Sequence, residues 1–420
     1  MNHVGQNEIP PRISLIAAFI IHASVEIPFF IFPVILLLVG SDLFQDSSSI
    51  GWLGLGTIGT VGTLSAALPS PFFGKLADNR RRGVLMTLSL VLTTIGTIII
   101  GFWGNFFVMM LCGVVFLGLG VSLYHPPGLS WVTTAYEDPT THSLSSKYNQ
   151  VLALHGIGGG LGASLGPISV YFLLGTLTWK ELYLFWTIPL IIITIVFWIF
   201  VGRYEPENHR SVAKMASKLV NNGKKLTKKN IQNSHIILLI IFAFMIAMSL
   251  NRGMIYFILS PFLSEVKGIE ITDAALYIGI STLIGSTGQL LGGYFGDRHG
   301  EDRVLSFGAL FTVVILVIIY FAEMLPILFL AYIFHGIVNA IFWPSTNSLV
   351  AKNSKNKGQA FGLVMLVANL VGALGPILVG ILRVLEPTSY FPIFLFASFF
   401  SILALLFLIY LRRTQNKLKY

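Results

Sequence analysis

His22 and Glu26 are the residues of this sequence whose types and spacing point most directly to chemistry. They lie four residues apart in an apolar stretch near 13–39, so on a helix they share one face. A carboxylate beside an imidazole inside a membrane can change its protonation near neutral pH, as proton movement through the membrane requires. The pair could instead be a satisfied hydrogen bond that fixes this helix to a neighbour. We expect the proton-carrying role.

Arg252, with Asn251 beside it, lies in the middle of another apolar stretch near 234–261. A charged side chain at the centre of a bilayer costs about 2.5–3.5 kcal/mol on insertion scales, so it persists where it meets a partner or a cavity. Three roles fit the guanidinium: pairing with Glu26, binding an anionic substrate, or lining a wet cavity. The sequence leaves this choice open.

Four polar or aromatic residues recur at steps of four in the stretch near 325–348: His335, Asn339, Trp343 and Asn347. Each step turns slightly past a full helical turn, so they form a slanting stripe on one side. Such a stripe predicts a cavity wall, with Trp343 placed to stack on a ligand. The alternative is hydrogen bonding between helices, worth only about 0.6 kcal/mol in membranes. Weaker candidates for the same cavity are His125, Gln150, His155 and Gln289.

A glycine at every fourth position marks the stretch near 148–174, which reads Gly158, Gly162, Gly166 and then Pro167. This spacing lets two helix backbones approach closely, and the proline can bend the helix. We predict that this stretch is a helix-packing seam.

Composition shows that the elements holding these residues are membrane helices. Hydrophobic residues make up 55% of the 420-residue chain and charged residues 11%, with a mean hydropathy of +0.79. A typical soluble domain is about 25% charged. A span needs about 20 mostly apolar residues. We expect twelve transmembrane helices, near 13–39, 50–73, 84–103, 106–127, 148–174, 181–202, 234–261, 272–295, 304–322, 325–348, 358–383 and 389–411.

Lysine and arginine predict the orientation of these helices. If both termini are cytoplasmic, the 27 basic residues gather on the cytoplasmic side, as the positive-inside rule requires. The exceptions are Lys180, Lys267, Arg383 and the intramembrane Arg252. The net charge of +9 is therefore explained by topology, and no nucleic-acid partner is expected.

A basic segment, 203–233, divides the chain into halves at 1–202 and 234–420. Apolar residues between Val212 and Val220 fall opposite lysines at helical spacing. This pattern fits an amphipathic helix on the anionic inner leaflet. A solvated basic linker fits equally well.

The two halves repeat three landmarks in the same order. The landmarks are Gly74…Asp78 and Gly293…Asp297, Gly118…Pro126 and Gly336…Pro344, and Leu165-Gly166-Pro167 and Leu374-Gly375-Pro376. Such matched spacing predicts duplicated six-helix bundles related by pseudo-symmetry.

The basic loop after the second helix of each half resembles the G-x-L-a-D-r-x-G-r-r signature of the major facilitator superfamily. The second copy fits through Asp297, Arg298 and Gly300, whereas the first has Asn79 and Arg81 at two family positions. The resemblance implies an all-α membrane fold in which the two halves rock around a midplane site. It also implies a conformational latch made by Gly74, Asp78, Arg82, Gly293, Asp297 and Arg298.

A narrower resemblance is to the fosmidomycin-resistance-like drug exporters of this superfamily. It rests on His22-x-x-x-Glu26 followed by Pro33, on Tyr124-His125-Pro126, and on Arg252 preceding Tyr256. The run Gly158-Gly159-Gly160 lacks the asparagine of that branch.

Together these features predict a multi-pass carrier in the cytoplasmic membrane that exports a small organic solute by proton antiport. Its expected partners are a small-molecule substrate, protons and the bilayer, and it is expected to be a monomer. The alternative is proton symport or facilitated uptake of a sugar or carboxylate, and a non-transporting sensor or assembly protein is less favoured. With no phosphate loop, metal-ligand cluster or nucleophile motif in the sequence, we expect no enzyme activity, cofactor or metal.

Overall fold

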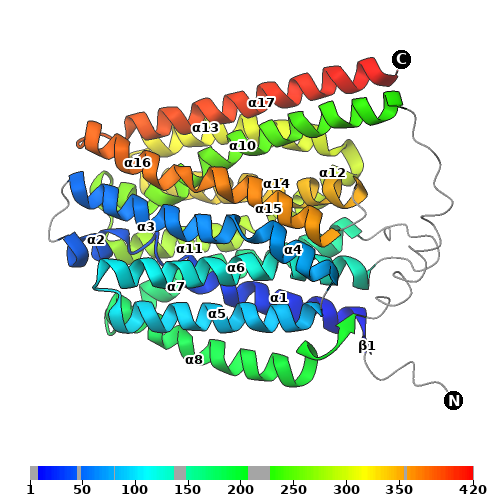
Figure 1. Ribbon diagram of the computed structural model, residues 1–420. Coiled ribbons are helices and arrows are strands. Elements are labelled where there is room, and N and C mark those ends of the chain that lie inside the picture. The colour runs from blue at the N-terminus through cyan, green and yellow to red at the C-terminus, as the bar shows by residue number, and fades with distance from the viewer. Residues whose placement is uncertain are drawn as a thin grey trace.

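The protein is a bundle of long helices that run roughly along one axis (Figure 1). The computed structural model describes residues 8–44, 49–79, 81–136, 148–206, 228–353 and 357–419. In that part of the chain, twelve helical segments are long and apolar enough to cross a membrane, which confirms the predicted number. The cytoplasmic location of the termini stays a prediction, although α1 begins and α17 ends at the same end of the bundle (Figure 1).

The first half contains eight α-helices, a π-helical turn and two short strands. They are β1 (Glu8–Ile9), α1 (Pro11–Phe29), α2 (Leu36–Phe44), α3 (Ser49–Ala67), α4 (Ser70–Asn79), α5 (Arg82–Trp103), α6 (Phe107–Ala135), α7 (Tyr148–Leu173), α8 (Trp179–Phe197), the π-turn (Trp198–Gly202) and β2 (Glu205–Pro206). The strands β1 and β2 pair in parallel and tie the chain before α1 to the chain after α8.

The second half continues with eight helices. They are α10 (Lys228–Glu265), α11 (Ile271–Gly285), α12 (Gly288–His299), α13 (Glu301–Phe321), α14 (Leu325–Asn353), α15 (Lys357–Gly372), α16 (Leu374–Leu385) and α17 (Phe391–Lys419). The apolar stretch expected around 212–220 lies outside the described residues, so its two interpretations stay open.

Several spans that were predicted as single helices are interrupted. The first is wrong as one helix over 13–39, because α1 ends at Phe29 and α2 begins only at Leu36. Pro33 lies in the break and has no backbone N–H to continue the helical hydrogen bonds. The second and eighth spans break at equivalent places, between Ala67 and Ser70 and between Gly285 and Gly288. Pro69 accounts for the former break.

The glycines of α7 lie against the backbone of α1. A Cβ atom added at Gly158 would lie 2.7 Å from the Phe19 carbonyl oxygen, and one at Gly166 would lie 2.5 Å from that of Ile27. Gly162 faces the Ala23 carbonyl between them. Any larger residue would push the two helices apart, so these positions hold α1 in place.

The two halves meet at both ends of the bundle. On one side of the break in the second span, α3 packs against α16, and a Cβ at Gly56 would lie 2.7 Å from the Pro376 carbonyl oxygen. On the other side, α4 packs against α15, where Gly362 faces the Ser70 carbonyl. The space between the halves is therefore bounded by helix contacts at each end.

We predict that Gly162→Val lowers the Tm of the detergent-purified protein, because overpacking of a tight contact costs about 1–3 kcal/mol. Gly175→Val is the matched control, since no atom lies within 4 Å of the position of its Cβ. Equal Tm values for the two variants would contradict the packing described for α1 and α7.

Candidate functional site

A central cavity of about 320 Å³ lies between the halves. Its walls come from α1, α3, α6 and α7 of the first half and from α10, α11, α12, α14, α15 and α16 of the second. Pockets that hold small organic ligands measure about 300–1,000 Å³, so this cavity suits a small one. Most of its lining residues are apolar, and the polar ones gather at a few points.

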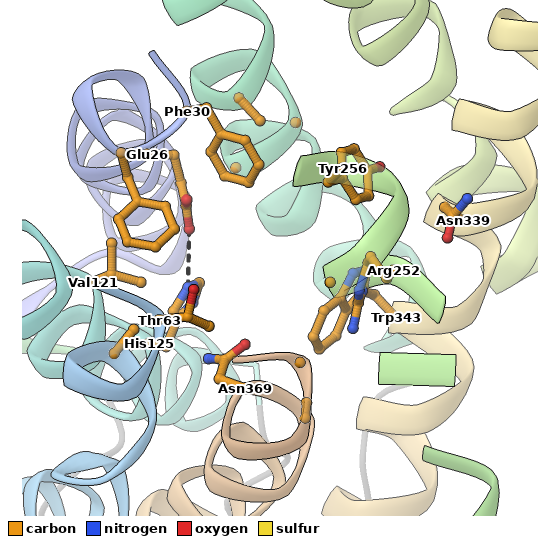
Figure 2. Close-up of a pocket in the computed structure, with 18 of the residues that line it drawn as sticks. Glu26, Phe30, Thr63, Val121, His125, Arg252, Tyr256, Asn339, Trp343 and Asn369 are labelled. Atoms are coloured by element: carbon orange, nitrogen blue, oxygen red, sulfur yellow. Dashed lines mark hydrogen bonds and ion pairs between the residues drawn. The ribbon is translucent and has the colours of Figure 1, made fainter. Parts of the chain in front are cut away.

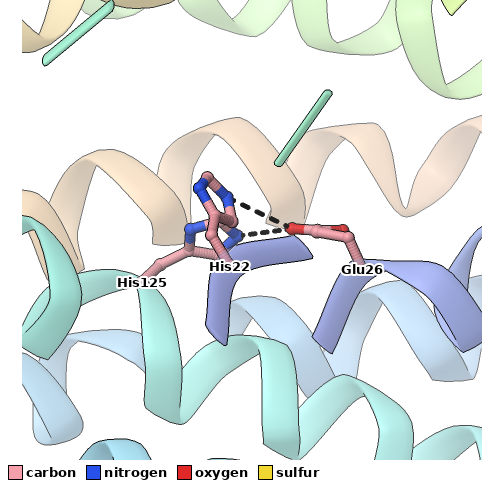
Figure 3. A group of neighbouring side chains, drawn as sticks. All are labelled: His22, Glu26 and His125. Carbon is pink, nitrogen blue, oxygen red and sulfur yellow. Dashed lines mark hydrogen bonds and ion pairs between the residues drawn. The ribbon is translucent and has the colours of Figure 1, made fainter. Parts of the chain in front are cut away.

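Glu26 is the carboxylate of this cavity, and it is held by two histidines (Figures 2 and 3). His125 Nε2 lies 3.0 Å from Glu26 Oε1, within hydrogen-bond distance. His22 Nε2 lies 3.7 Å from the same oxygen. Glu26 is 7% exposed, so these contacts replace most of its hydration. The sequence predicted the pairing of His22 with Glu26, but the shorter contact is with His125 on α6.

A second layer of hydrogen bonds fixes the His22 ring. His22 Nδ1 lies 3.0 Å from the His155 carbonyl oxygen. Since a carbonyl can only accept, Nδ1 carries the proton, and Nε2 of a neutral ring turns a lone pair toward Glu26. Tyr124 Oη donates to the Ala18 carbonyl at 2.6 Å and lies 2.9 Å from His155 Nε2. The cluster therefore offers a proton two places, on the Glu26 carboxylate or on His22 Nε2.

Glu26, His22 and His125 are also close enough together to surround a metal ion. One ligand atom from each lies within 4.8 Å of the others. The sequence predicted no metal. The hydrogen bond with His125 gives the carboxylate one protein partner.

Arg252 lies on α10, across the cavity from Glu26 (Figure 2). Its guanidinium carbon lies 4.6 Å from the centre of the Trp343 ring, a cation–π contact. The ion pair between Arg252 and Glu26 that the sequence allowed is absent, because Glu26 pairs with the histidines instead. Asn251 faces away, donating from Nδ2 to the Ala397 carbonyl at 2.8 Å, so its expected role in the cavity was wrong.

The other predicted cavity residues divide into three groups. Asn339, Trp343, His155 and Gln289 line the cavity. His335 lies behind this wall, 3% exposed, with its ring 6.1 Å from that of Tyr256 and its carbonyl accepting from Asn339 Nδ2. The side chains of Gln150 and Asn347 lie outside the described part of the structure.

Two latch residues, Asp78 and Arg82, meet partners from other elements, and Arg298 meets one within its own helix, α12. Asp78 Oδ2 accepts a hydrogen bond of 3.0 Å from the Gln359 amide in the first turn of α15, so this carboxylate lies at the N-terminal end of a helix of the other half. The Arg82 amide donates to Glu205 Oε1 at 2.8 Å. Burial raises the pKa of Glu205, and the charges of Arg82 and Arg81 oppose that rise. Arg298 donates to the Tyr294 hydroxyl at 2.9 Å, and the side chain of Asp297 is not described.

Two features of the structure were missed from the sequence. Asn369 on α15 lines the cavity near its centre (Figure 2), and the signal for it was an amide within an apolar span. Arg383, placed in a loop by its position near a span end, is buried in α16, where its Nη2 lies 2.9 Å from Glu265 Oε2. Its guanidinium carbon also lies 5.0 Å from the ring centre of Trp52 on α3 of the other half.

The sequence matches the Major Facilitator Superfamily over residues 14–287 and 241–419. The chain therefore belongs to this superfamily of membrane transporters, as the repeated loops indicated, and it is not an enzyme. The narrower resemblance to the fosmidomycin-resistance-like branch stays a prediction.

Relatives and solved structures agree with this family. The chain is 23% identical to the "Uncharacterized MFS-type transporter YfnC" of Bacillus subtilis over 87% of this chain and 85% of the relative. It is 22% identical to the "Multidrug resistance protein MdtG" of Salmonella paratyphi C over 78% and 77%. The human organic anion transporter MFSD10 has the same fold, with a TM-score of 0.71, 17% identity, and coverage of 96% of this chain and 100% of that one. The xylose transporter XylE of E. coli gives a TM-score of 0.70, 15% identity, and coverage of 94% and 95%.

We predict that Tyr124→Phe destabilises the protein by about 1–3 kcal/mol, because buried hydrogen-bond partners at Ala18 and His155 lose the hydroxyl. Tyr410→Phe is the control, since Tyr410 is 58% exposed. The measurement is Tm in detergent. A Tyr124→Phe variant as stable as Tyr410→Phe would show that this second layer does not hold the histidines.

Proposed function

We propose that this protein is a proton-coupled carrier of a small organic solute and that Glu26 carries the proton. The observation that carries the proposal is the hydrogen-bonded cluster of Glu26, His125 and His22 on the wall of the central cavity. A buried carboxylate within hydrogen-bond distance of an imidazole has a neighbouring group with which it can exchange a proton. Because the cluster lines the cavity, its charge acts on whatever binds there.

The elements around the cavity support alternating access as the transport mechanism. The halves contact each other through α3 and α16, through α4 and α15, and through α7 with α11 and α12, so opening at either end means separating contacts of these helices. The hydrogen bond from the Gln359 amide to Asp78 would close one of these ends and break when it opens. We therefore assign Asp78 the role of latch in one state.

Export by proton antiport is supported by the relatives named multidrug resistance proteins. Symport of an organic anion with a proton is the second candidate. It is favoured by one observation, the positive charge of Arg252 in the cavity without a carboxylate partner among the described residues. The two modes differ in the direction in which protons move when the solute moves.

The test is a solute screen in proteoliposomes that hold a pH indicator. We expect solute-evoked proton movement in the wild type and none in Glu26→Gln, because glutamine keeps the hydrogen bond from His125 but cannot exchange a proton. Solute binding should persist in this variant. Proton movement toward the solute's destination indicates symport, and the opposite direction indicates antiport.

Glu323→Gln is the control for this variant, since Glu323 is an exposed carboxylate that does not line the cavity. It should behave as the wild type. Wild-type proton movement in the folded Glu26→Gln protein would remove Glu26 as the coupling residue.

A further inference from the structure

No carboxylate of the described part of the chain forms an ion pair with Arg252. In the part of the chain that the structure describes, its guanidinium forms neither an ion pair nor a hydrogen bond with another residue. A charged group in a transmembrane helix persists where it meets a partner or a water-filled space. The other buried arginine of the second half, Arg383, has such a partner in Glu265. Arg252 instead faces open volume.

Glu26 cannot serve as the partner of Arg252 in this arrangement. Its Oε1 atom accepts from His125 at 3.0 Å and lies 3.7 Å from His22. The two charged residues sit on opposite walls, on α1 and α10, with the cavity between them (Figure 2). A ligand that enters the cavity therefore meets a free cation on one side and an occupied carboxylate on the other.

Trp343 holds the guanidinium in a useful orientation. The guanidinium carbon lies 4.6 Å from the ring centre, and no hydrogen bond to another residue of the described part of the chain occupies the N–H groups. These groups form a planar fork that matches the two oxygens of a carboxylate or phosphate. Asn339 and Asn369 offer amide groups at the same cavity.

The remaining walls favour a flat apolar body. Phe29, Phe30, Phe257 and Tyr256 line the cavity together with Trp343. The volume of about 320 Å³ limits the ligand to a small molecule.

We propose that the cavity binds a small organic anion whose oxyanion group pairs with Arg252 and whose apolar body packs against Trp343 and the phenylalanines. This rests on the proposed function in one respect, that the central cavity is the transport site. The anion site itself does not depend on Glu26 carrying a proton.

A bound anion and an ionised Glu26 repel each other. Anion binding therefore favours the protonated form of Glu26. The titratable or charged groups that face Glu26 are His22 on α1, Tyr124 and His125 on α6, His155 on α7, and, across the cavity, Arg252 and Tyr256 on α10. An anion on Arg252 removes the positive potential that favours the ionised carboxylate. Proton and anion therefore bind cooperatively, which is the behaviour expected of symport, the second candidate mode of the proposed function.

Matched naphthalene derivatives test this charge selectivity in the purified full-length protein by isothermal titration calorimetry. The probes are 2-naphthoate, the neutral 2-naphthamide and the cationic 2-naphthylmethylamine. We expect 2-naphthoate to bind at least about tenfold more tightly than the amide, since loss of a charge-assisted pair is worth about this factor. The amine should bind more weakly than the amide.

Variants assign the selectivity to residues. Arg252→Gln should bind the acid and the amide equally, whereas Arg252→Lys should keep part of the preference through its charge. Trp343→Leu should weaken the acid and the amide together. Trp103→Leu is its control, because Trp103 is 48% exposed and does not line the cavity.

The outcomes separate the anion site from proton coupling. Glu26→Gln should retain the anion preference but lose the tightening of at least about fivefold expected for the wild type as the pH falls. An anion preference without pH dependence would remove Glu26 coupling and leave the anion site. Equal or tighter binding of the amide or amine, no binding of 2-naphthoate, or a preference that survives in Arg252→Gln would overturn the anion site.

Discussion

The hydrogen bond between His125 Nε2 and Glu26 Oε1 is the contact on which the charge pattern of the cavity depends. It joins α1 to α6, so the carboxylate that lines the cavity is paired with a residue of its own half of the protein. The bond pairs Glu26 within the first half, while Arg252 on the opposite wall contacts Trp343. The negative and positive groups of the cavity therefore stay on separate walls.

The packing of α1 makes the bond possible. Glycines of α7 bring the α1 backbone close, and the His155 carbonyl, one turn before those glycines, accepts from His22. The ring of His22 stacks on that of His155, with centroids 4.7 Å apart. Tight helix packing, ring orientation and the position of the carboxylate are thus linked, because a shift of α1 along α7 would move His22 and Glu26 together.

Much of the fold could be predicted from the sequence, because the bilayer imposes simple requirements. Length and apolar content define twelve spans, and repeated landmarks identify the superfamily. The helix breaks were missed because a hydropathy pattern does not register the loss of one backbone hydrogen bond near Pro33. Arg383 was misplaced because its partner, Glu265, is distant in sequence and lies at the end of another span.

The sequence predicted most residues of the site but not which of them contact each other. Spacing along one helix finds neighbours such as His22 and Glu26, whereas the contact with His125 joins residues 99 positions apart. That contact removes one of the three roles left open for Arg252, the pairing with Glu26. Asn251 was wrongly assigned because adjacent residues on a helix face different directions, toward the cavity and toward α17.

Proton uptake during anion binding tests the central claim most directly. Adding 2-naphthoate to lightly buffered, purified protein with a pH indicator should draw up to about one proton per bound anion from solution, because cooperative binding of the two ligands is reciprocal. The neutral 2-naphthamide should draw none. Proton release, or no change in pH while 2-naphthoate binds, would contradict the account of a proton on Glu26 facing an anion on Arg252.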